Sequence, residues 1–110
     1  MSTIRSSREI DKVFRCAQRS VNPLVLVLAA RSPMERDPLG RVAFIAGKKL
    51  GNAVVRNRSK RVLRAAVREA GGPWPGHDVL VIARPQTAQA SSPDVAKAIA
   101  VALRRLEVVS

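Results

Sequence analysis

This sequence is poor in cysteine, aromatic residues and acidic residues, and each shortage excludes a class of function. The single cysteine, Cys16, cannot form an intramolecular disulfide or a cysteine-based zinc site, which favours a reducing cytoplasm. Aromatic residues make up only 3% of the chain, which argues against recognition by many base-stacking rings. The eight carboxylates are scattered, whereas a protein-based nuclease normally groups them around its metal ions. The missing acidic cluster therefore disfavours a protein-only nuclease, and no set of metal ligands is evident.

Long hydrophobic runs are absent as well. The longest apolar run, residues 24–30, is far shorter than the ~20 residues that span a bilayer. The N-terminus has no apolar segment of signal-peptide length. With 110 residues and a hydrophobic content of 46%, the chain is expected to form one domain over residues 1–110 with a single modest core. These features predict a soluble, cytoplasmic protein.

Positive charge is what the chain has in excess. Twenty lysines and arginines against eight acidic residues give a net charge of +12, which is typical of proteins that bind nucleic acid or an anionic membrane. The densest stretch begins at Lys48, and no acidic residue interrupts it before Glu69. Because so many like charges destabilise an isolated protein by self-repulsion, we expect an anionic partner.

The hydrophobic patterns predict a single-domain α+β sandwich in which helices cover a small mixed sheet, in the order α-β-β-α-β-α. Apolar residues at helical spacing indicate the helices, and short apolar runs indicate the strands. We expect the first two strands to pair as an antiparallel hairpin across an exposed turn at residues 31–40. The predicted elements are helix 8–19, strands 24–29 and 41–46, helix 52–70, strand 78–83 and a last helix that starts within residues 91–94.

The central helix separates its cations from its apolar residues. Asn52 is a good N-cap, and a rotation of about 100° per residue places cations four residues apart in one row. The opposite, apolar side can bury against the sheet and hold the cations outward. The planar guanidinium group suits phosphates, and the helix N-terminus also favours anions. The predicted RNA-binding residues are Lys48, Lys49, Asn52, Arg56, Asn57, Arg58, Lys60, Arg61, Arg64 and Arg68.

A solvated helix, a membrane-bound helix and two common RNA-binding modules fit these residues less well. A solvated helix would intersperse glutamates, and a membrane-bound helix would need bulky apolar anchors outside the core. A KH loop needs Gly-x-x-Gly, but the segment from Gly47 to Gly51 has one residue too many. An RRM would carry aromatic residues on its strands, and only Phe44 is available. A non-enzymatic RNA-binding protein, such as a ribosomal protein or an RNA chaperone, stays open on these grounds.

The segment that starts at Asn52 reads Asn-Ala-Val-Val-Arg-Asn-Arg-Ser-Lys-Arg and follows the pair Lys48 and Lys49. It closely resembles the signature of the bacterial ribonuclease P protein component. Residues 9–14 look like the first helix of that family, and residues 77–84 look like its last strand. The resemblance therefore covers nearly the whole chain.

This resemblance implies a subunit of a ribonucleoprotein that removes the 5′ leader of precursor tRNA by endonucleolytic cleavage. The partners would be a catalytic RNA and precursor tRNA, with no membrane and no protein partner. The scissile chemistry would belong to Mg²⁺ bound with the RNA subunit, and the protein alone would bind no cofactor. The resemblance further implies a left-handed strand-helix-strand crossover, against the usual right-handed preference.

The resemblance also implies a cleft between the first helix and the sheet that holds the single-stranded leader. The family usually has an aromatic residue where Ile10 stands here and often has one where Val27 stands, so we expect leader contacts in this chain to rest more on shape and charge than on stacking. Phe14 is equally compatible with a place in the core. The residues carried over to the leader cleft by position are Ile10, Phe14, Val27 and Phe44.

Overall fold

A computed structural model describes residues 7–31 and 40–108, apart from the side chains of Ser7, Glu9 and Cys16. The predicted α+β class is confirmed, and the predicted order of elements is found with one additional strand, β1. None of the helices in these ranges has the length and apolarity needed to cross a membrane. The elements are α1 (Ser7–Cys16), β1 (Gln18–Asn22), β2 (Val25–Arg31), β3 (Arg41–Ile45), η1 (Lys48–Leu50), α2 (Ala53–Glu69), β4 (His77–Ala83), η2 (Thr87–Gln89) and α3 (Ser92–Arg105).

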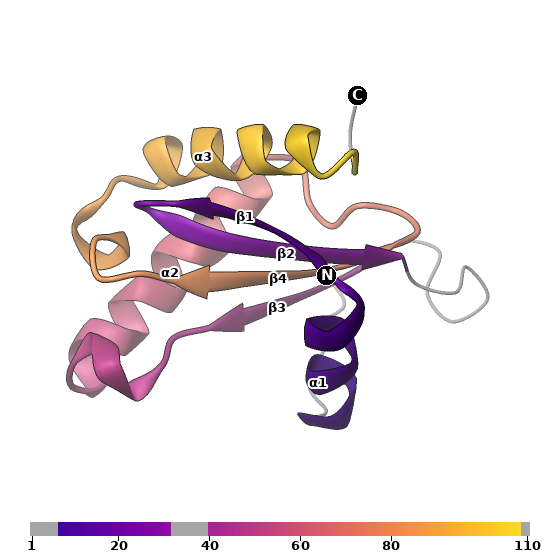
Figure 1. Ribbon diagram of the computed structural model, residues 1–110. Helices are drawn as coiled ribbons and strands as arrows, with labels where there is room; N and C mark the ends of the chain where they lie inside the picture. The colour runs from indigo at the N-terminus through magenta and orange to yellow at the C-terminus, as the bar shows by residue number, and fades with distance from the viewer. Residues whose placement is uncertain (1–6, 32–39, 109–110) are drawn as a thin grey trace.

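The four strands form one mixed sheet in the order β1-β2-β4-β3 (Figure 1). The predicted hairpin between β2 and β3 is wrong, because β4 lies between them, antiparallel to β2 and parallel to β3. The reason is hydrophobic: Val79, Leu80 and Val81 are fully buried, so β4 needs cover on both faces and takes a central place. The predicted turn at residues 31–40 lies mostly outside the described residues.

The predicted first helix extends too far. The observed helix α1 ends at Cys16, and residues 18–22 pair with β2 as an antiparallel strand. In the turn between these strands, the Asn22 Oδ1 atom accepts a hydrogen bond of 2.9 Å from the Leu24 N–H. A helix of about 12 residues is only marginally stable by itself. Pairing with β2 therefore makes the polar residues 18–22 a strand and not the last turn of the helix.

Two clusters of buried residues lie on opposite faces of the sheet. Helices α2 and α3 cover one face, which we call the α2–α3 face, and α1 covers part of the other, which we call the α1 face (Figure 1). The α2–α3 face holds the main core, which includes Val25, Val27, Val42, Leu63, Val67, Val79, Val81, Ile99 and Leu103. The α1 face holds a smaller cluster of Val13, Leu28, Ala43 and Leu80.

Helix α2 connects β3 to its parallel neighbour β4, as the predicted strand-helix-strand crossover requires. The Asn52 Oδ1 atom accepts a hydrogen bond of 3.1 Å from the Val55 N–H, so the predicted N-cap is confirmed. At the other end Gly71 has φ = +93°, and the Gly71 and Gly72 N–H groups bond to carbonyls of the last turn. This glycine cap satisfies carbonyls that would otherwise lack partners and ends the helix.

Helix α3 packs beside α2 and closes the main core. Ser91 is its N-cap, and its buried residues include Val95, Ile99, Ala102 and Leu103, as the helical spacing predicted. The Ser92 hydroxyl donates a 2.7 Å hydrogen bond to the Glu69 carboxylate at the end of α2. The two helices are therefore joined both by packing and by a polar contact.

Candidate nucleic-acid interface

Helix α2 presents its cations on the side that faces away from the core. Ser59, Leu63, Ala66 and Val67 are buried, so they fix the rotation of the helix about its axis. The predicted arrangement of an apolar inner side and a cationic outer side is therefore confirmed. Of the predicted RNA-binding residues in α2, Arg56 and Lys60 are half-buried, and Asn57, Arg58, Arg61, Arg64 and Arg68 are exposed.

The charge of this surface is not neutralised by carboxylates in the part of the chain that the structure describes. The ion pair that the structure shows there joins Arg41 and Asp78, which lie on neighbouring strands with side-chain atoms 2.9 Å apart. Glu69, the acidic residue within α2, accepts its hydrogen bond from Ser92 instead of from an arginine. Six cations on one helix thus keep their charge available for an anionic partner.

One of these cations has an aromatic partner. The Arg64 Cζ atom lies over the Phe44 ring, 5.6 Å from its centroid, within the range of a cation–π contact. Phe44 belongs to the edge strand β3 and packs against the main core on the α2–α3 face. The contact therefore ties the cationic surface of α2 to the edge of the sheet.

Two more predicted cations precede α2. Lys48 and Lys49 form most of the short 3₁₀ helix η1, and both are exposed. Because the Asn52 oxygen is used as the helix cap, only its amide N–H groups remain to contact a phosphate. The structure thus places the predicted RNA-binding residues on one continuous stretch from η1 to the end of α2.

The four residues predicted for the leader cleft do not come together. Ile10 packs on the α1 face, and Phe14 on the same helix is 41% exposed. Val27 is fully buried in the main core, and Phe44 packs against that core, on the opposite face of the sheet. Residues of a strand alternate between faces, so Leu26 and Ile45 lie on the α1 face where Val27 and Phe44 do not.

The α1 face instead has a transverse row of four aliphatic residues, which we call the aliphatic row: Val21, Leu26, Ile82 and Ile45. They are direct partners across β1, β2, β4 and β3 in turn. Val21 is 55% exposed and the other three are half-buried. The row lies at the ends of β3 and β4 that lead to η1 and η2, so it is close in sequence to the cationic stretch. The alternation of side chains along a strand could have placed Leu26 and Ile45 on one face, but the row itself depends on strand pairing that the sequence patterns did not reveal.

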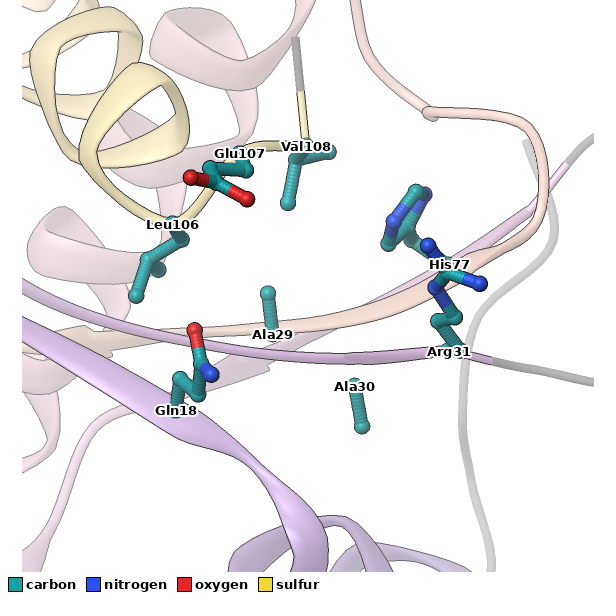
Figure 2. Close-up of a pocket in the computed structure, with 8 residues that line it drawn as sticks. All are labelled: Gln18, Ala29, Ala30, Arg31, His77, Leu106, Glu107 and Val108. Atoms are coloured by element: carbon teal, nitrogen blue, oxygen red, sulfur yellow. The ribbon is translucent and has the colours of Figure 1, made fainter.

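A pocket of about 470 Å³ lies at the other end of the sheet (Figure 2). Arg31 and His77, the last pair of the β2–β4 ladder, form one wall, and Glu107 beyond α3 contributes to the opposite one. Because the pocket carries both signs of charge and is far along the strands from the aliphatic row, it does not extend the cationic surface. Within residues 7–31 and 40–108, no group of three or more histidine, cysteine, aspartate or glutamate residues is arranged to hold a metal ion.

Comparison with known proteins agrees with this geometry. The family model described as Ribonuclease P matches residues 1–107. The chain is 39% identical over 82 residues to the ribonuclease P protein component of Syntrophomonas wolfei, an alignment that covers 74% of this chain and 66% of that one. It is 33% identical over 102 residues to the ribonuclease P protein component of Dehalococcoides mccartyi strain CBDB1, which covers 93% of this chain and 82% of the relative.

Solved structures show the same fold at lower sequence identity. The RNase P protein of Staphylococcus aureus superposes with a TM-score of 0.81 at 21% identity, and covers 100% of this chain and 99% of that one. The RNase P protein of Thermotoga maritima superposes with a TM-score of 0.75 at 23% identity and the same coverage. The likeness therefore extends over the whole of the fold described above.

Proposed function

This chain belongs to the ribonuclease P protein family and acts with an RNA subunit in an endoribonuclease, and we propose that α2 and η1 bind that RNA. The single observation that carries this assignment of the interface is the cationic surface of α2, which has no carboxylate partner among the described residues. The family match also decides against the alternative of a ribosomal protein or an RNA chaperone. We place the complex in the cytoplasm, in keeping with a reducing compartment.

We propose further that the 5′ leader of precursor tRNA binds on the α1 face, over the aliphatic row. A single strand needs an apolar surface for its bases and cations for its phosphates. The aliphatic row supplies the first, and Lys48 and Lys49, which follow β3, supply the second. Phe14 contributes a half-exposed ring at the flank of α1. In this proposal Val27 and Phe44 do not contact the leader, because they lie on the α2–α3 face of the sheet.

The proposal leaves the cleavage chemistry, and the Mg²⁺ that supplies it, to the RNA subunit. Mg²⁺ prefers carboxylate oxygens and water, whereas the surface of α2 carries six cations against one carboxylate, Glu69, and repels it. Asp78, the most buried carboxylate among the described residues, is already engaged by Arg41. The residues described here therefore do not fit a resident Mg²⁺, and the protein contributes binding and orientation.

A cleavage assay tests the division of labour between protein and RNA. Precursor tRNA is incubated at low Mg²⁺ with the protein alone, with the catalytic RNA alone, and with both. We expect release of the leader only in the combined reaction. Cleavage by the protein alone would contradict the proposal, because it would place catalytic groups in this chain.

The salt dependence of binding tests the interface itself. If α2 makes about six phosphate contacts, the affinity for the catalytic RNA falls by several decades for each tenfold rise in salt. Arg56→Ala or Lys60→Ala is expected to lower that slope by roughly one unit. The matched control is Lys97→Ala, which removes an exposed cation from α3 and should leave the slope unchanged. Equal slopes for all variants would remove α2 from the interface.

A further inference from the structure

Phe44 occupies a position that neither the leader cleft nor the core fully accounts for. Its neighbours along β3, Ala43 and Ile45, face α1, whereas Phe44 points to the α2–α3 face at the open edge of the sheet. The ring is only partly buried, because β3 is the edge strand of the sheet β1-β2-β4-β3. The Arg64 Cζ atom lies over this ring, 5.6 Å from its centroid.

This contact leaves the hydrogen-bonding capacity of Arg64 intact. A carboxylate partner would occupy guanidinium N–H donors and neutralise the charge, whereas an aromatic ring attracts the cation through its π face. All five N–H donors thus remain able to bind phosphate or the edge of a guanine. In the described ranges, the contact that the structure shows for the Arg64 side chain is the one with this ring.

The ring also restricts a side chain that would otherwise be mobile. Lys60 and Arg56, one and two turns earlier in the same row, are half-buried, so the protein surface confines their stems. Arg64 is exposed, and an exposed arginine loses considerable rotamer entropy when it binds. A cation–π contact made before binding lowers that loss, which is the general benefit of preorganisation.

We propose that Phe44 is a positioning residue for the RNA subunit: its ring holds the Arg64 guanidinium, still fully charged, in line with Arg56 and Lys60. The inference rests on the proposed function of α2. It gives this phenylalanine a role on the catalytic-RNA side of the sheet, and not on the leader side. The role belongs to the aromatic ring and not to its volume in the core.

A double-mutant cycle tests this proposal through the affinity of the full-length protein for the catalytic RNA. Phe44→Leu keeps an apolar side chain but removes the π face, so the dissociation constant should rise about two- to fivefold, the size expected of an exposed cation–π contact. In an Arg64→Ala background the same substitution should have no effect. The matched control background is Arg68→Ala, which removes a neighbouring exposed cation, and there the full effect of Phe44→Leu should persist.

A ring series keeps the test decisive if Phe44→Leu folds poorly. Phe44→Tyr should bind like the parent, and Phe44→Trp, with the strongest π face, should bind at least as tightly. An equal effect of Phe44→Leu in the presence and absence of Arg64 would overturn the proposal, as would weaker binding by the Tyr variant with unchanged thermal stability. If the parent protein does not bind the catalytic RNA at all, the proposed function itself has failed, which is a distinct outcome.

Discussion

The two faces of the sheet are covered to very different extents. On the α2–α3 face, residues from two long helices and three strands form the main core, in which Leu63, Val67 and Ile99 are fully buried. On the α1 face, one helix of ten residues contributes Val13 to a cluster of four buried side chains, and the aliphatic row beyond it stays half-exposed. In a protein that binds RNA, this difference gives one face the task of stabilising the fold and leaves the other face open for a ligand.

The main core stabilises the fold and also sets the direction in which the cations of α2 point. Because α2 buries Leu63, Ala66 and Val67, the helix cannot rotate, and its cations must point outward against their mutual repulsion. The α1 face gives up part of its possible burial and keeps apolar surface open for a ligand. An exposed apolar surface beside cations is costly for the free protein and useful only when a partner covers it.

The largest effect that should separate the two faces is on stability. Leu63→Ala removes a fully buried side chain from the main core and is expected to lower the free energy of unfolding by about 2–5 kcal/mol. Leu26→Ala makes the same chemical change in the half-buried aliphatic row and should cost only about 1 kcal/mol. Denaturant unfolding measures both. Equal losses would show that the α1 face is packed as tightly as the other.

A second effect should appear only on the α1 face and only with a leader present. Stacking of one base on an aromatic ring is worth about 1–3 kcal/mol, so Phe14→Ala should weaken binding of precursor tRNA by the assembled complex about tenfold. Binding of tRNA without a leader is the control and should not change. If both substrates lose affinity equally, Phe14 is part of the core or of another interface, and not of the leader site.

The sequence was sufficient for the features that depend on local chemistry. The Asn52 cap, the glycine stop after Ala70 and the outward cations of α2 all follow from residues within one helix, and the structure contains each of them. The buried face of α3 follows in the same way from its helical spacing. The family resemblance added the crossover between parallel strands, which no periodicity contains.

Pairing between distant segments could not be predicted in this way. The choice of β4 as the partner of β2 depends on which strand is buried on both faces, and this is a property of the whole sheet. The strand β1 was missed because its residues, Gln18–Asn22, are mostly polar and pair only at an edge. Val27 and Phe44 were predicted to line the leader cleft from their positions in the family pattern alone. Side chains alternate along a strand, so Leu26 and Ile45 lie on the α1 face and Val27 and Phe44 lie on the other.

The smallest effect concerns the most exposed member of the aliphatic row. Val21→Thr replaces one methyl group by a hydroxyl group at a site that is 55% exposed, so the free energy of unfolding should change by less than about 0.5 kcal/mol. If the leader covers this side chain, the polar atom must lose water without a fixed partner, and affinity for precursor tRNA should fall about two- to threefold. The measurement is a competition between substrates with and without a leader. A selective loss for the substrate with a leader would extend the leader path to the edge strand β1, whereas no selectivity would end that path at β2.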